Sequence, residues 1–279
     1  MGKLLTTTLF LSVIFTIPVS AQYYYKDILS NKQLVADMDI YKEHKIKTIE
    51  VNSFEADQSP SKGFFCEKKI SKDYRKMETR TRSFVTNKSI LTTSFDSKGL
   101  VIKSVDSTDV NSSTSDYTYD NNGNLSSIVS YSRSNDDDFT TSLNEVRQYS
   151  YNDKGQLEKM VRIKNQKDTT EIDFTIDEKG NITEETEVAM YGNHYYYYYD
   201  AQNRLTDIVR YNIVKQRPIP DFMFEYNSNN QIEKMIATQE GVNANYFVWK
   251  YLYDDKLRIK EKCFSKEGDL LGYFEYQYE

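Results

Sequence analysis

Residues 117–125 read YTYDNNGNL and contain the pattern that decides the fold of this chain. Two tyrosines at alternating positions precede Asp120, two polar residues follow, and Gly123, one further residue and Leu125 complete the pattern. Alternating aromatic residues suit a pleated strand. An Asp side chain accepts hydrogen bonds from backbone N–H groups two residues later, and glycine enters the left-handed backbone region freely. The stretch therefore predicts a β-hairpin with a loop of four or five residues that ends in a bulge.

The same pattern recurs along the chain and predicts a series of hairpins. Four further complete copies and three partial copies are present: residues 149–157, 174–182, 197–205 and 224–232, and residues 95–101, 251–259 and 264–270. Two complete copies carry Asn203 or Asn230 in place of glycine, and Asn also tolerates the left-handed conformation. Leu257 stands at that position in residues 251–259, so we expect a distorted turn there.

The segment before the repeats adds a helix and three strands. Leu34, Met38 and Tyr41 have the spacing of one helix face, so residues 31–41 are predicted to form a short helix. Strands are predicted at residues 46–54, 64–70 and 74–85, which brings the expected total to about 18. A twisted sheet seldom exceeds about 10 strands without curling or splitting. The predicted fold is all-β: an antiparallel meander of repeated hairpins in one curled sheet (an open trough, a spiral or a closed barrel), with a short N-terminal helix.

The repeated residues resemble the YD repeats of the RHS family, in which tyrosine and aspartate are followed by two variable residues, glycine, a variable residue and leucine. The resemblance covers roughly residues 90–279, and the arginine that usually precedes the aliphatic residue is present as Arg204 and Arg258. It implies a curled antiparallel sheet, which in some members forms a shell around a toxin domain. This chain is far too short for such a shell, so the resemblance implies a fold and almost nothing about function.

Composition excludes several classes of protein. The chain has 279 residues, with 42 acidic and 36 basic side chains and a net charge of −6. An acidic chain provides no field that attracts a polyanion, so nucleic acid is not an expected partner. Aromatic residues make up 14% of the chain and include 24 tyrosines, which argues against disorder.

The first 21 residues have the features of a cleaved secretory signal peptide. Lys3 is followed by the mostly apolar residues 4–17, then by Pro18 and the small residues that end at Ala21. This stretch is too short to span a bilayer as a helix. We expect cleavage after Ala21, a single domain over residues 22–279 and a secreted or periplasmic protein. No cysteine follows the cleavage site, so a lipid anchor is not indicated.

A membrane β-barrel would also fit an exported chain with short turns and many aromatic residues. The predicted strands argue against it, because Lys159, Glu184, Asp207 and Lys234 stand among their aliphatic residues. A charge that faces lipid near the bilayer centre costs about 2–4 kcal/mol. The protein is therefore not expected to span a membrane.

The two cysteines, Cys66 and Cys263, lie near opposite ends of the strand series. Strands about 4.8 Å apart would separate them by tens of ångströms in an open meander, whereas a disulfide needs Cα atoms within about 7 Å. A disulfide would require that the sheet close or that the first strands fold back. Two buried free thiols are the simpler interpretation.

Nothing in the sequence identifies a reaction. His44 and His194 are the two histidines, and the motifs of serine hydrolases, zinc proteases, P-loop proteins and dinucleotide-binding proteins are absent from the sequence. The abundant Asp residues already have a role in turns. Residues 120–131 lack the glycine and the glutamate that a calcium loop needs. We therefore predict no enzymatic activity, no cofactor and no metal site.

One candidate binding surface is aromatic. Tyr195, Tyr197 and Tyr199 fall on one face of a predicted strand, and flat rings with polar groups suit sugars or peptides. The alternative is packing against the equivalent tyrosines of neighbouring hairpins.

A second candidate surface is basic. Lys76, Arg80 and Arg82 share one strand face within the basic residues 62–82, and could dock an anionic glycan or a lipid head group. A solvated strand face is the alternative.

These features together predict an exported, non-enzymatic repeat protein that binds a glycan or a cell-envelope component through its Tyr-rich sheet surface and loops. The alternative function is a structural or secretion-associated scaffold that binds an envelope protein at an exposed sheet edge. An enzyme acting on polysaccharide is a third hypothesis, which two carboxylates about 5–10 Å apart in a cleft would support. The identity of the ligand and the oligomeric state stay open at this point.

Overall fold

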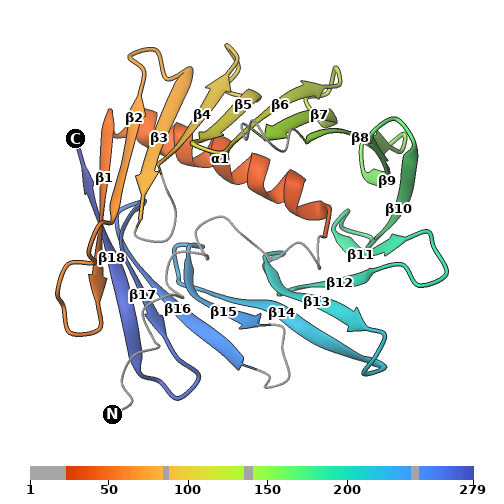
Figure 1. The fold of residues 1–279 in the computed structure, drawn as a ribbon. Helices are drawn as coiled ribbons and strands as arrows, with labels where there is room; N and C mark the ends of the chain where they lie inside the picture. The colour runs from red at the N-terminus through yellow and green to blue at the C-terminus, as the bar shows by residue number, and fades with distance from the viewer. Residues whose placement is uncertain (1–22, 84–87, 135–140, 240–244) are drawn as a thin grey trace.

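The computed structural model describes residues 23–83, 88–134, 141–239 and 245–279, which form one helix and eighteen strands in a single sheet (Figure 1). The predicted signal peptide lies outside the described residues. The helix is α1 (Tyr25–Glu43). The strands are β1 (Thr48–Glu55), β2 (Phe65–Ile70), β3 (Lys76–Arg82), β4 (Ser89–Phe95), β5 (Val101–Thr108), β6 (Asn111–Tyr119), β7 (Leu125–Ser134), β8 (Ser142–Tyr151), β9 (Leu157–Lys164), β10 (Asp168–Ile176), β11 (Ile182–Glu187), β12 (His194–Tyr199), β13 (Leu205–Asn212), β14 (Arg217–Tyr226), β15 (Ile232–Gln239), β16 (Asn245–Asp254), β17 (Leu257–Phe264) and β18 (Leu270–Tyr278).

The sheet closes on itself. Each strand pairs antiparallel with the strand before it and the strand after it, and β1 pairs with both β2 and β18. Ile49 of β1 lies opposite Lys68 on one side and opposite Tyr278 on the other. Figure 1 shows the orange β1 beside the blue β18, completing the ring. Of the three predicted forms of the sheet, the structure is the closed barrel, and the strands it describes leave no unpaired edge.

The repeated motif forms the predicted turn. In the first complete copy the N–H of Asp120 donates to the carbonyl of Asn124 (2.9 Å), and the N–H of Gly123 donates to the carbonyl of Asp120 (3.0 Å). The carboxylate of Asp120 accepts from the N–H groups of Asn122 and Asn124. Both backbone bonds recur in residues 96–100, 152–156, 177–181, 200–204 and 227–231. The left-handed position has φ of +83° at Gly123, +67° at Asn203 and +62° at Asn230, as predicted.

Two copies of the motif depart from this geometry. In residues 251–259 the loop shrinks to Asp255 and Lys256, with Asp254 opposite Leu257 and φ of +52° at Asp255. This altered turn follows from Leu257, which occupies the position that favours glycine. Residues 265–269 keep the two backbone bonds, with the hydroxyl of Ser265 in place of the carboxylate. That turn joins β17 to β18 and lies at the opposite end of the barrel from the other repeat turns.

A β-bulge directly after each repeat turn decides which side chains face inward. Tyr119 lies opposite Leu125, whereas Thr118 lies opposite Ser127, so Ser126 is an extra residue. Leu125 and Ile128, three positions apart, are therefore both buried on the inner face. Equivalent register shifts follow the turns that start β5, β9, β11, β13, β15 and β17.

The bulge corrects the predicted strand faces. Simple alternation places Lys159 on the face of Leu157, but the extra residue Glu158 moves Lys159 to the outer face, while Leu157 and Met160 are buried inside. On the outer face Lys159 pairs with Glu171 at 2.8 Å. The prediction from strict alternation of side chains was wrong here, because each bulge inserts one residue and shifts the alternation of inward and outward side chains. Glu184, Asp207 and Lys234 lie on the outer face for the same reason.

The tyrosine that precedes the Asp or Asn of the motif joins neighbouring repeats. The hydroxyl of Tyr226 donates to the carbonyl of Leu205 at 2.7 Å, and that of Tyr253 donates to the carbonyl of Ile232 at 2.9 Å. The same bond is made by Tyr119, Tyr151, Tyr199 and Tyr278. The accepting residue immediately precedes the bulged residue, where the sheet ladder is disrupted. This bond gives six of the 24 tyrosines a structural role.

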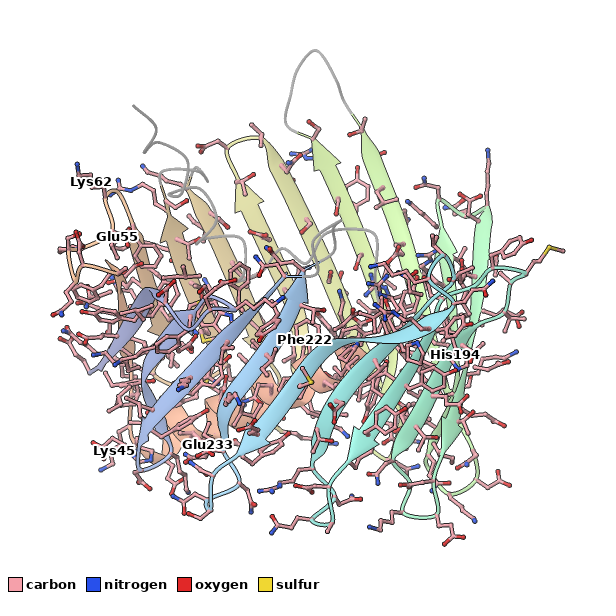
Figure 2. The ribbon with its side chains drawn as sticks, turned by 90° about the horizontal axis from the view of Figure 1, so that it is seen from below. Lys45, Glu55, Lys62, His194, Phe222 and Glu233 are labelled. Atoms are coloured by element: carbon pink, nitrogen blue, oxygen red, sulfur yellow. The ribbon has the colours of Figure 1, made fainter. Side chains whose placement is uncertain are left out.

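The helix α1 lies inside the barrel, near the end that carries all the repeat turns except the one at residues 265–269, which we call the turn end (Figures 1 and 2). Figure 2 shows Lys45 and Glu233 at this end, and Glu55 and Lys62 at the opposite end, which we call the loop end. The helix is longer than the predicted 31–41 at both ends. Ile28 near its N-terminus packs in one hydrophobic cluster against β7–β13, and Met38 packs in a second cluster against β1–β5 and β16–β18.

Candidate functional site

The inner wall of the barrel changes from apolar at the turn end to polar at the loop end. Inward pairs of the neighbouring strands β6 and β7 show the change, in order from the turn end: Tyr119–Leu125, Tyr117–Ile128, Ser115–Ser130 and Ser113–Ser132. The hydroxyls of Ser115 and Ser130 lie 2.8 Å apart. The apolar part packs against α1 and keeps a cavity of about 410 Å³ beside the helix, whereas the polar part lies nearer the loop end.

A polar cavity of about 330 Å³ lies on this wall at the loop end. Its floor is one row of directly opposed residues on β5 to β8: Asp106, Ser113, Ser132 and Leu143. Asn111 stands at its margin and is exposed, whereas Arg133 follows the inward Ser132 and has its exposed side chain on the outer face. One oxygen of Asp106 accepts a hydrogen bond from Ser89 at 2.9 Å. The cavity thus combines a carboxylate, an amide and several hydroxyls.

The predicted aromatic surface lies in the core. Tyr195 is 0% exposed and Tyr197 2% exposed, and both rings face inward from β12. Tyr23, beside the start of α1, contacts both, with ring centroids 5.7 Å and 6.3 Å away. Tyr199 makes the inter-repeat bond to the carbonyl of Ile182. These rings therefore do not form a sugar-binding platform, because the closed sheet turns their face toward the helix.

Glu185 of β11 receives the N-terminus of α1. Its carboxylate accepts the backbone N–H groups of Tyr24 (2.7 Å) and Tyr25 (2.9 Å) and the hydroxyl of Tyr197 (2.7 Å). The helix has no capping side chain of its own at this end. Burial disfavours the charged form and outweighs the three donors, raising the pKa of Glu185 to about 7.

A second polar contact fixes the first turn of the helix. The carboxylate of Asp27 accepts from the guanidinium of Arg147 (2.8 Å) and from the hydroxyl of Tyr149 (2.6 Å). Arg147 also pairs with Glu145. Nearby, the guanidinium of Arg162 donates to the hydroxyl of Tyr24 at 2.5 Å. Side chains from three strands, β8, β9 and β11, thus hold α1 at its N-terminal turn.

Sequence reasoning missed Glu185, although the repeats contain a signal for it. Because of the bulge, the side chain three residues after the aliphatic residue of the motif faces inward. Most copies carry an apolar residue at this position, such as Ile128, Met160 and Ile208. Glu185 occupies that position after Ile182. A carboxylate at a core position of a repeat indicates a specific polar contact.

The predicted basic face lies on the outer wall of β3. Lys76, Arg80 and Arg82 alternate with the buried Met77 and Thr79, so the three basic residues share the outer face as predicted. Glu78 lies between them, 2.7 Å from Arg80 and 3.7 Å from Lys76.

The described part of the chain contains no group of three or more His, Cys, Asp or Glu side chains arranged to hold a metal ion. His194 pairs with Glu184 on the outer wall at 3.1 Å, whereas His44 lies 3.5 Å from Asp255 at the turn end. Cys66 and Cys263 are buried free thiols, as the simpler interpretation predicted. Burial raises the pKa of both thiols, that of Cys263 to about 12.

No helix within the described ranges is both long and apolar enough to cross a membrane.

Comparison with known proteins gives similarity to solved structures alone. No family model and no curated protein matches the sequence, so the resemblance to YD repeats stays a prediction. A structure of the Photorhabdus luminescens Tc holotoxin pore is similar over 77% of this chain and 12% of that chain, at 15% identity and a TM-score of 0.36.

Two further solved structures show comparable similarity. A porin-like protein from Bacteroides uniformis is similar over 84% of this chain and 96% of that chain, at 12% identity and a TM-score of 0.40. The TcdB2–TccC3–TEV structure is similar over 78% of this chain and 15% of that chain, at 13% identity and a TM-score of 0.33. This chain therefore spans a small fraction of both toxin chains, and its function must be argued from its own residues.

Proposed function

We propose that this is an exported, non-enzymatic protein that binds a glycan of the cell envelope in the polar cavity at the loop end of the barrel. The observation that carries the proposal is the inward row of Asp106, Ser113 and Ser132, which lines a cavity of about 330 Å³. A glycan is the same class of ligand that the sequence analysis predicts. The proposed binding site, however, is this row of residues and not the buried tyrosines of β12.

The chemistry of the cavity suits a ligand rich in hydroxyl groups. Serine hydroxyls both donate and accept, and a carboxylate accepts from two adjacent hydroxyls. Asp106 has one oxygen bonded to Ser89, and its second oxygen has no protein donor among the described residues. A sugar that presents neighbouring hydroxyls would satisfy that oxygen and the serine row together.

The outer wall supports a barrel surrounded by water. Its strands carry ion pairs away from both ends, including Lys159 with Glu171, Lys103 with Asp116 and Lys260 with Glu275. Such charges would cost about 2–4 kcal/mol each if they faced lipid near the bilayer centre.

Closure of the sheet argues against the alternative function, a scaffold that binds an envelope protein at an exposed sheet edge. A scaffold that binds a partner at an exposed sheet edge needs unpaired backbone groups, and the pairing of β1 with β18 leaves none at that seam. A scaffold role would have to use side chains on the outer wall instead.

Glycan arrays followed by calorimetry on positive glycans would test the proposal. Asp106→Asn and a Ser113→Ala/Ser132→Ala double variant should each weaken binding about tenfold or more, because a buried polar contact to the sugar is lost. The matched control is Asp116→Asn, which removes an outward carboxylate on β6 that pairs with Lys103. The proposal fails if the wild-type protein binds no glycan, or if Asp106→Asn and Asp116→Asn bind equally well.

A further inference from the structure

Three lysines lie directly opposite one another on the outer wall. Lys234 of β15 is opposite Lys250 of β16, which is opposite Lys262 of β17. Their sequence neighbours Met235, Trp249 and Cys263 face inward, so the lysines face outward. Lys234 pairs with Glu225 at 2.7 Å. Within the described chain, Lys250 and Lys262 have no carboxylate partner, and the ammonium of Lys250 lies 5.2 Å from the ring centroid of Phe264.

This row is unfavourable for the protein alone. Side chains directly opposite on neighbouring strands have Cβ atoms about 4.5–5.5 Å apart, and like charges there repel. The whole chain has a net charge of −6, so the lysines are not part of a generally basic molecule. Elsewhere on the outer wall, lysines such as Lys159 and Lys260 have acidic partners on the adjacent strand. Lys250 and Lys262 lack such partners, which indicates a surface where an external anion would neutralise their charges.

An apolar row runs beside the lysine row. Its members are half-buried, lie opposite one another on β14 to β17, and are two residues nearer the loop end: Met223, Ile236, Val248 and Phe264. Two parallel rows, one cationic and one apolar, form an amphipathic band across the strands. Residues two apart along a strand are about 7 Å apart, so one ligand can cover both rows.

We propose that this band, formed by Lys234, Lys250, Lys262 and the apolar row, binds an acidic amphipathic helix of a partner protein laid across the strands. Successive turns of a helix are 5.4 Å apart and neighbouring strands about 4.8 Å apart, so carboxylates one turn apart match lysines one strand apart. Apolar side chains on the adjacent helix face would cover the apolar row. A wholly polar anionic glycan would match the lysines but leave that row uncovered.

The site is separate from the polar cavity of the proposed function, because the band faces outward from β14–β17 and the cavity faces inward from β5–β8. Either proposal can therefore fail without the other.

The probe is a fluorescein-labelled helical peptide of about 14 residues, long enough to cross three strand gaps. It carries Glu at positions one turn apart and Leu on the adjacent face, and a peptide of scrambled order is its control. Fluorescence anisotropy should show binding of the ordered peptide only. A Lys250→Gln/Lys262→Gln variant should weaken binding about tenfold or more, and added salt should weaken wild-type binding.

The matched control variant is Lys154→Gln/Lys179→Gln, which removes two exposed lysines from turns at the turn end and should bind as the wild type does. Lys250→Gln should also leave the melting temperature unchanged or raise it, because it relieves repulsion in the row. An unchanged or higher melting temperature would show that Lys250 is not needed for stability, so that weaker peptide binding reflects a role in binding. The proposal is overturned if the ordered peptide does not bind, or binds the Lys250→Gln/Lys262→Gln variant equally well. It is also overturned if heparin oligosaccharide or phosphatidylglycerol vesicles bind the band in place of the peptide.

Discussion

Single side chains in this protein act mainly by satisfying backbone groups that the repeat leaves free. The hydroxyl of Tyr226 reaches the carbonyl of Leu205 in the preceding repeat, next to the bulge. Phenylalanine fills the same space without a donor, and the partial copy that starts at residue 95 carries Phe95 at this position. The tyrosines therefore serve the fold, and a count of aromatic residues is a poor guide to a binding surface here.

Glu185 is the side chain whose ionisation should be visible in the stability of the whole protein. Its pKa in the folded state is about 7, above the ordinary value of 4.5. Its contribution to stability is therefore fully present below pH 4.5 and is lost as the pH rises through 7. The loss is of the order of 3 kcal/mol, from about 1.4 kcal/mol per pKa unit. Glu185→Gln should lack this loss, so the difference in unfolding free energy between variant and wild type should shift by about that amount between pH 4 and pH 8.

Urea unfolding at several pH values measures this difference. A Glu184→Gln variant is the matched control, because Glu184 lies on the outer face and pairs with His194. Parallel pH profiles for wild type and Glu185→Gln would contradict the role assigned to Glu185.

At the scale of elements, the turn and its bulge form one unit. The turn fixes the left-handed residue, the bulge sets the inward face, and the tyrosine bonds to the repeat before. Neighbouring turns also contact one another at the turn end: the amides of Asn181 and Asn203 donate to each other, and Arg204 donates to Asn230. The repeats are thus joined by side chains as well as by the sheet ladder.

Gly123→Ala tests the backbone requirement of the turn. The position has φ of +83°, and an added Cβ would meet no atom within 4 Å, so the substitution introduces backbone strain without a clash. We expect a loss of about 1–2 kcal/mol in unfolding free energy. Asn122→Ala, which changes the preceding exposed residue and keeps its N–H bond to Asp120, should be nearly neutral. Equal stability of the two variants in urea would show that the left-handed residue is unimportant.

At the scale of the whole molecule, closure between β1 and β18 brings the first and last strands together. The N–H groups of Lys47 and Thr48 donate to the carbonyl of Glu279, which fastens the segment after α1 to the last residue of the chain. Cys66 and Cys263 lie on strands flanking this seam and are buried. Their reactivity therefore reports whether the barrel is closed.

Glu275→Pro should open the seam. Glu275 lies opposite Asn52 of β1 and Lys260 of β17, and proline removes its N–H and disrupts the ladder of an interior strand. Both thiols should then react with Ellman's reagent under native conditions, whereas in the wild type they should react only after unfolding. Glu275→Ala keeps the N–H and loses only the ion pair with Lys260, so its thiols should stay protected. Protected thiols in the proline variant would mean that closure does not depend on this pairing.

The sequence predicted the turns well, but not which side chains face inward. Turn chemistry is local: Asp120 and Gly123 act within five residues of each other, so their roles are visible in any one copy. Inward and outward faces are not local, because each bulge shifts the alternation by one residue. Tyr195 and Tyr197 were therefore assigned to a surface, although the closed sheet places them against α1.

The repeated hairpins, the number of strands and the left-handed turn residues depend on contacts between residues close together in the chain, so they could be predicted from the sequence. Three other features depend on long-range contacts that form only in the folded barrel: β1 meets β18, Glu185 holds α1 inside, and Asp106, Ser113 and Ser132 line one cavity. These contacts join residues up to about 230 positions apart, such as Ile49 and Tyr278. Their partners are set by the curvature of the whole sheet, which no single repeat specifies.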